Sequence, residues 1–239
     1  MTFTFPDYMV GRRRLVFSTD AKNEADDQYA VVHALLSPIL DVRGIMPAHF
    51  GTDRGRASMQ QSRAEIDLLL NLMQMTGRLP VADGSPVALV DEQTTQDSRG
   101  ARLILEEARR GDGTLFVVAI APLTDVVSAI LLDRKVIEQH VIVVWVGGAP
   151  YGERIPVYSP EYDLANDVAA AQVVFGSDVE LWQVPMSSYT QMSVGHHELR
   201  QRVAPHGAIG KYLVDQLLEF SERAPIRLES HSLGDTPAM

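Results

Sequence analysis

The chain has no cysteine among its 239 residues. This absence excludes disulfide bonds, thiolate metal sites and cysteine nucleophiles, and it fits a reducing compartment. Basic residues are also scarce, because 21 Lys and Arg stand against 31 Asp and Glu, giving a formal net charge of -10. A chain with no basic surplus is poorly suited to neutralising a phosphate backbone, so we expect no nucleic-acid partner.

Long hydrophobic runs are missing as well. No apolar stretch approaches the ~20 residues that span a bilayer, and the opening MTFTFPDYMVGRRR lacks the charged start and apolar stretch of a secretory signal. We therefore expect a cytoplasmic protein with no membrane partner. Hydrophobic residues make up 46% of the chain, enough for a full core, so one domain over residues 1–239 is expected. The end at Met239, soon after Asp235, leaves open a truncation at the C-terminus.

Apolar, β-branched runs alternate with helical patterns along the chain. This alternation predicts an α/β fold with a mostly parallel sheet and helices on both of its faces. A segment rich in Gly, Pro and Asp, residues 77–97, predicts a long loop, and residues 207–224 form one amphipathic helical pattern. The expected strands are 14–19, 42–48, 114–120, 141–148 and 179–185, and the expected helices between them are 26–36, 57–75, 98–110, 123–132 and 167–175.

Acidic residues follow the first expected strand. Asp20 closes that strand, and Asp26 and Asp27 open the next helix, so the loop between them brings three carboxylates toward one edge of the sheet. Ligands of open parallel sheets gather at that edge, and converging oxygens suit a hard cation such as Ca²⁺. The alternative is that Asp26 and Asp27 are first-turn acids stabilised by the helix dipole, each contributing about 0.3–1 kcal/mol.

Two familiar acidic motifs do not fit this loop. An EF-hand starting at Asp20 would need Gly at the sixth position and Glu at the twelfth, where the chain has Ala25 and Val31. A phosphatase-type nucleophilic Asp would need a second carboxylate two positions on, where the chain has Lys22.

Three further strand ends carry oxygen donors. The turn after VVAI, residues 117–120, lets the carbonyl of Ile120 point past the sheet edge. Glu161 and Asp163 alternate on a segment expected to be extended, so they face the same side. Asp235 precedes Thr-Pro, a helix start. Each has an ordinary explanation, as a turn, a solvated loop or a helix cap, but their coincidence at strand ends favours a shared site.

The residues in these four places resemble the nucleoside hydrolase family. The family opens with a strand followed by Asp-x-Asp-x-x-x-Asp-Asp; here Ser18 stands at the first Asp, Asp20 at the second, and Asp26 and Asp27 at the final pair after two extra residues. VVAIAPLTD resembles the family's strand followed by Gly-Pro-Leu-Thr-Asn, with Ala121 in the place of Gly and Asp125 in the place of Asn.

The later motifs also resemble the family. EYDLANDVAAAQVVF is similar to Glu-Phe-Asn-Ile-x-x-Asp-Pro-Glu-Ala-Ala, with Asp163 for Asn. LGDTP matches the late metal-binding Asp, although Gly234 stands where many members carry His. The match covers roughly residues 13–186 and 228–239, with all four motifs in order.

The resemblance implies a Rossmann-like α/β fold, one Ca²⁺ ion and hydrolysis of the N-glycosidic bond of a ribonucleoside or a related N-ribosyl compound. It also implies a homodimer or homotetramer acting on a small-molecule substrate. Asp20 is the candidate catalytic base. The implied ligands of Ca²⁺ are Asp20, Asp27, the carbonyl of Ile120 and Asp235, and the candidate substrate-binding residues are Asn23, Asp26, His49, Glu161 and Asp163.

Two departures from the family keep an alternative open. Gly234 cannot donate a proton to the leaving base, and residues 48–51, AHFG, replace the family's Gly-Asn after the second strand. His49, Tyr189, Trp182 and His231 are candidates to compensate. The alternatives are a non-catalytic, metal-containing protein of the same fold that binds a sugar or nucleoside, and an acidic cluster that holds no ligand.

Overall fold

A parallel five-stranded sheet forms the centre of the protein. The computed structural model describes residues 11–51, 57–152, 160–223 and 228–239. The strand order is β2-β1-β3-β4-β5, and every neighbouring pair is parallel, which confirms the expected α/β fold. The strands are β1 (Arg13–Thr19), β2 (Leu40–Pro47), β3 (Leu115–Ile120), β4 (Val141–Val146) and β5 (Glu180–Val184).

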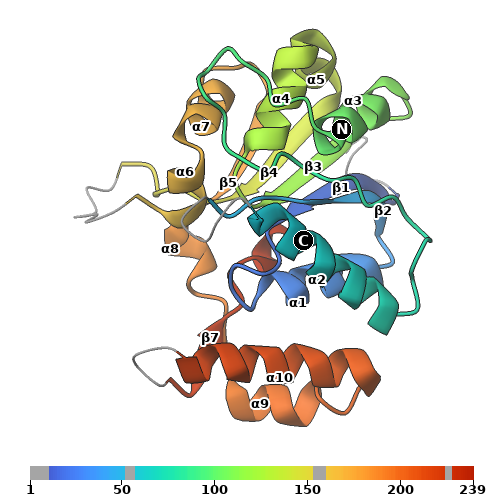
Figure 1. Cartoon of the computed structure of the whole chain (residues 1–239), viewed down its shortest axis with the longest axis vertical. Helices are drawn as coiled ribbons and strands as arrows, with labels where there is room; N and C mark the ends of the chain where they lie inside the picture. The colour runs from blue at the N-terminus through green and yellow to red at the C-terminus, as the bar shows by residue number, and fades with distance from the viewer. Residues whose placement is uncertain (1–10, 52–56, 153–159, 224–227) are drawn as a thin grey trace, which may run out of the picture.

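Helices cover both faces of this sheet (Figure 1). Alternate residues of one strand enter different cores: Val117 packs with one buried cluster and Val118 with the other. This explains why the central strands are continuously apolar. One face packs against α3 (Arg99–Arg109), α4 (Thr124–Leu132), α5 (Arg134–His140) and α7 (Val168–Phe175), and the other against α1 (Asp27–Leu36) and α2 (Ser58–Leu72), with α10 (Gly207–Arg223) packed against α2 on the side away from the sheet (Figure 1).

The first and third strands form the switch point of the sheet. β1 and β3 are neighbours, with Thr19 opposite Ile120 at their carboxyl ends. The chain leaves β1 toward α1 and leaves β3 toward α4, and these two helices pack on opposite faces. The divergence opens a crevice at that edge, where ligands of such sheets bind.

The last part of the chain returns to this crevice. A two-stranded antiparallel sheet pairs β6 (Ser193–Gly195) with β7 (Ser230–Ser232), and the short helix α9 (His196–Arg202) precedes α10. After β7, a 3-10 turn over Thr236–Ala238 lies against α1 and β4. The C-terminus therefore lies among the first elements of the fold, as Figure 1 shows.

Some expected elements differ from the structure. The segment with Glu161 and Asp163 is not extended: Glu161 caps the short helix α6 (Tyr162–Asn166), and Asp163 lies in its first turn. Oε2 of Glu161 accepts a hydrogen bond from the N–H of Leu164 and so stabilises this turn. The sequence pattern did not predict α5 or the four-residue α8 (Met186–Tyr189). Within the 77–97 loop, Val81 alone makes a bridge, to Ile45.

No helix within the four described ranges is both long and apolar enough to cross a membrane. Residues 1–10, which contributed to the argument against a secretory signal, lie outside those ranges.

Candidate active site

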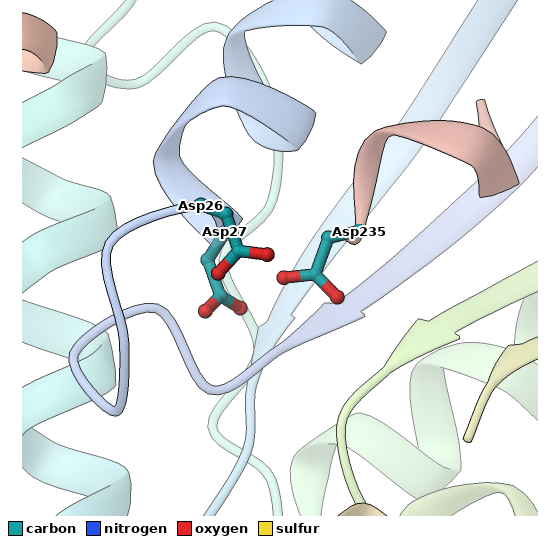
Figure 2. A group of neighbouring side chains, drawn as sticks. All are labelled: Asp26, Asp27 and Asp235. Atoms are coloured by element: carbon teal, nitrogen blue, oxygen red, sulfur yellow. The ribbon is translucent and has the colours of Figure 1, made fainter. Parts of the chain in front are cut away.

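Three carboxylates meet at the carboxyl edge of the sheet. Asp26 and Asp27 stand at the start of α1, and Asp235 immediately precedes the C-terminal 3-10 turn. One oxygen of each lies within 4.8 Å of the others, and Figure 2 shows the side chains directed toward a common point. The Oγ1 of Thr19, the last residue of β1, donates to Oδ1 of Asp27 at 2.6 Å and fixes that side chain.

Asp26 does not act as an ordinary helix cap. It occupies the N-cap position of α1, but its side chain makes no capping hydrogen bond. Its carboxylate instead accepts hydrogen bonds from the backbone N–H groups of Gly234 and Asp235. Burial raises the pKa of Asp26 to about 6, against the opposing effect of these hydrogen bonds. Asp26 therefore ties the first motif to the last one, which a first-turn acid of a surface helix would not do.

The carboxylates line a small polar cavity. Its volume of about 60 Å³ has room for an ion and a water molecule, since a water needs at least ~10–15 Å³. The cavity is lined by Asp20, Asn23, Glu24, Asp26, Asp27, Ile120, Val146, Tyr162, Tyr189, Gly234 and Asp235.

Negative charge is crowded in this region. Burial is the largest cause that raises the pKa of Asp20, Asp27 and Asp235 well above the usual value, and neighbouring carboxylates raise each of them further. Like charges that are both buried and close cannot all ionise without compensation. In addition, the buried Oδ2 atom of Asp20 has no hydrogen-bond partner among the residues that the structure describes. A buried cluster of carboxyl groups with an unpartnered oxygen fits a bound hard cation, which would compensate their charge.

Glu161 and Asp163 lie beside this cluster. Oε2 of Glu161 accepts from the N–H of Gly148 at 2.7 Å, after β4, and Oε1 accepts from the hydroxyl of Tyr189 at 3.1 Å. The pKa of Asp163 is raised well above its usual value, first by burial and then by Glu161 and Asp27. The short helix thus brings Asp163 within electrostatic range of the carboxylates of α1.

The expected residues do not all meet in the cavity. Asp20, Asn23, Asp26, Asp27 and Asp235 line it together with Ile120. Asp26, which we expected to hold the sugar, belongs to the tightest group of three, whereas Asp20, expected as a metal ligand, lines the cavity outside that group.

His49 lies away from the cavity lining and is 1% exposed. Its Nδ1 accepts from the N–H of Gly51 at 3.2 Å, so Nε2 carries the proton and donates to Oγ1 of Thr124 at 2.8 Å. Thr124 in turn donates to Asp167 at 2.6 Å. Burial lowers the pKa of His49, so this imidazole is neutral and both of its nitrogens are occupied within the protein.

Glu24, Val146 and Tyr162 line the cavity without having been assigned a role from the sequence. Glu24 was visible as one more acid of the first loop. Tyr162 was expected on the opposite side from Glu161 and Asp163, an expectation that depended on an extended backbone there.

The geometry defines a class of protein: a parallel α/β fold with helices on both faces of the sheet and, at its switch point, an acidic crevice that could bind a cation. A family model described as inosine-uridine preferring nucleoside hydrolase matches residues 15–237. The chain belongs to this family, whose members are hydrolases acting on the N-glycosyl bonds of small nucleosides.

Individual relatives are distant in sequence and similar in fold. A probable uridine nucleosidase 2 of Arabidopsis thaliana is 22% identical over 228 residues, covering 84% of this chain and 68% of that protein. The pyrimidine-specific ribonucleoside hydrolase RihB of Escherichia coli is 21% identical over 252 residues, and the match covers 95% of this chain and 75% of RihB. The structure of a purine-preferring ribonucleoside hydrolase from Gardnerella vaginalis superposes with a TM-score of 0.78 at 19% identity, covering 95% of this chain and 78% of that one.

Proposed function

We propose that the protein is a Ca²⁺-dependent hydrolase of ribonucleosides or related N-ribosyl compounds, with Asp20 as the catalytic base. The main support is the convergence of Asp26, Asp27 and Asp235 from opposite ends of the chain, beside an Asp20 oxygen for which the described part of the chain offers no hydrogen-bond partner. Membership of the family indicates that the bond broken is the N-glycosidic bond.

We assign the cation to Asp20, Asp27, Asp235 and the carbonyl of Ile120. Carboxylate and carbonyl oxygens are the ligands that Ca²⁺ prefers, and Ca²⁺ tolerates irregular geometry better than Mg²⁺ does. When bound, the ion supplies positive charge that offsets the mutual repulsion of these acids and favours their ionised forms.

The proposed reaction needs a proton acceptor and a grip on the sugar. Asp20 takes a proton from water, whose oxygen forms a bond to the anomeric carbon as the bond from that carbon to the base nitrogen breaks. The electron pair of the broken bond leaves with the base, which takes a proton from solvent, and Asp20 returns its proton to solvent. Asp26, Glu161 and Asp163 accept hydrogen bonds from the sugar hydroxyls, and Asn23, in the same loop as Asp26, contacts the sugar beside it.

The negative field also favours this bond cleavage. Positive charge develops on the sugar ring in an oxocarbenium-like transition state, and preorganised carboxylates stabilise such charge. The backbone N–H of Gly148 and the hydroxyl of Tyr189 hold Glu161 in place before substrate arrives, so little reorganisation is needed at that residue.

The proposed role of His49 is indirect. Since both of its nitrogens are bonded within the protein, we propose that it supports substrate binding by holding the segment 48–51 rather than by donating to the sugar. The single-domain organisation, the cytoplasmic location and the homodimer or homotetramer remain predictions.

Incubation with a panel of purine and pyrimidine ribonucleosides in Ca²⁺ tests the proposal. We expect free ribose from wild-type protein and a large loss of release from Asp20→Ala. Ribose release no greater than in that variant would refute the hydrolase. Calorimetric titration with the same nucleosides would then test the alternative, a non-catalytic protein that binds nucleosides.

A further inference from the structure

A buried carboxylate stands behind the loop that carries the first acidic motif. Glu65, in the middle of α2, is 4% exposed and lies outside the cavity lining. It lies on a helix that carries none of the sequence motifs described above. A carboxylate buried to this extent needs hydrogen-bond donors to compensate for its loss of water.

Within the described ranges, the donors to Glu65 come from the acidic loop, from the first turn of α1 and from α10. Nε2 of Gln28 donates to Oε1 at 3.1 Å, and Nζ of Lys22 lies 3.1 Å from Oε2. The hydroxyl of Tyr212, in α10, also donates to Oε1. Gln28 extends the attachment, since the same Nε2 donates to the carbonyl of Ala21 at 2.6 Å.

These contacts fasten both ends of the loop. Ala21 and Lys22 follow Asp20 directly, and Gln28 follows Asp27 directly. Helix α10 adds a third attachment in the middle, because Nε2 of Gln216 donates to the carbonyl of Ala25 at 2.8 Å. The loop between Asp20 and Asp27 is thereby held to α2 and α10 by hydrogen bonds that do not involve the carboxylates of the cavity.

A loop with several carboxylates facing one point is under repulsion before a cation arrives. Each residue that must be ordered on binding lowers the affinity, so a loop already fixed by its surroundings binds more tightly. Residues that orient the ligands of a metal commonly change its affinity by 10–100-fold when replaced.

We propose that Glu65 is a positioning residue of the acidic site: together with Lys22, Gln28 and Tyr212 it holds the Asp20–Asp27 loop in the geometry that binds the cation. This inference rests on the proposed Ca²⁺ site. It adds a determinant of affinity that lies on α2, outside every motif recognised in the sequence.

The test compares Ca²⁺ affinity in Glu65→Gln and Tyr212→Phe with that of wild type, by calorimetry and by competition with a Ca²⁺ indicator. The control is Glu107→Gln. Glu107 is equally buried, at 4% exposed, and pairs with Arg14 at 3.1 Å. Arg14 lies near the start of β1, six residues before Asp20, which is roughly 20 Å away along a strand.

We expect Glu65→Gln to raise the Kd for Ca²⁺ about tenfold or more, and Tyr212→Phe to raise it by a smaller factor. Glu107→Gln should lower the Tm without changing the Kd. Tyr212→Phe is decisive because it removes a hydrogen bond and leaves every charge in place, so its effect cannot come from a weaker negative field. It also remains available if Glu65→Gln fails to fold.

Two results would overturn the inference while leaving the proposed function standing: an unchanged Kd in both variants, or weaker binding by Glu65→Gln alone, which indicates a charge effect. Absence of Ca²⁺ binding by wild-type protein is a different outcome. It would remove the proposed metal site, and this inference with it.

Discussion

The ring of Tyr189 occupies the space in front of Gly234. A Cβ atom added at position 234 would lie 3.0 Å from Cδ2 of Tyr189 and 3.3 Å from Oδ2 of Asp26. Tyr189 is held there by its hydroxyl, which donates to Glu161, and by its carbonyl, which accepts from the hydroxyl of Ser232. The absence of a side chain at Gly234 thus makes room for an aromatic wall of the cavity.

Gly234→Ala should therefore destabilise the protein by about 1–3 kcal/mol, as overpacking does in tight sites. It should also weaken Ca²⁺ binding, because residue 234 directly precedes Asp235, a proposed ligand of the ion. Urea denaturation of Gly234→Ala, Tyr189→Ala and the double variant measures the coupling. In the Tyr189→Ala background the substitution at 234 should cost far less; equal costs in both backgrounds would contradict steric conflict with the ring.

Ca²⁺ should stabilise the folded protein. A ligand that binds only the native state adds about 2.7 kcal/mol at a concentration 100 times its Kd, and here it also relieves repulsion among Asp20, Asp27 and Asp235. Thermal unfolding with Ca²⁺ and with a chelator measures the gain. Asp235→Asn should lose most of it, whereas Asp215→Asn, on the exposed side of α10, should keep it. A Tm insensitive to Ca²⁺ in wild type would argue against the site.

Asp163 should influence the acid limb of the pH–rate profile. Burial is the largest cause of the raised pKa of Asp20, and the charges of Asp27 and then Asp163 raise it further. Replacing Asp163 by Asn removes one of these charges, so the pKa of Asp20 should fall and activity should persist to lower pH. Profiles of kcat/KM at saturating Ca²⁺ for wild type and Asp163→Asn provide the measurement. An acid limb that stays in place would count against Asp20 as the base or against its coupling to Asp163.

The architecture was predictable from the sequence because its strands are apolar on both faces. The run VVAI, for example, alternates between two cores without a polar break, so its length and position are visible directly. β3 was expected at 114–120 and is found at Leu115–Ile120. The α5 helix escaped notice because Arg134–His140 buries only Ile137, too little for a periodic pattern.

The candidate site was harder to predict, because the distances between its side chains depend on where the last residues of the chain pack against the first helix. Local spacing places Asp26 and Asp27 beside each other, but nothing local indicates that Asp26 accepts from the N–H groups of Gly234 and Asp235. The role of Glu65 was equally hidden, since a single Glu in an amphipathic helix resembles any surface acid. One of its hydrogen-bond donors is Tyr212, 147 residues away.

Asp125 should make the stability of the protein depend on pH. Burial raises its pKa from 3.8 to about 6, although the hydroxyl of Ser98 and the N–H of Ser85 donate to it and oppose the shift. Between these two pH values the unfolded chain loses the proton before the folded one does, so the stability contribution falls as pH rises. The difference corresponds to roughly 3 kcal/mol.

Asp125→Asn should remove this dependence. The amide oxygen can still accept from Ser85 and Ser98, and any cost of burying the amide nitrogen is the same at every pH. Urea denaturation of both proteins from pH 4 to pH 7 isolates the effect: the stability of Asp125→Asn relative to wild type should rise by a few kcal/mol across pH 4 to 6 and then level off. A relative stability that stays constant would mean that the Asp125 carboxyl ionises in the folded protein as easily as in the unfolded chain, and that its two donors fully compensate for burial.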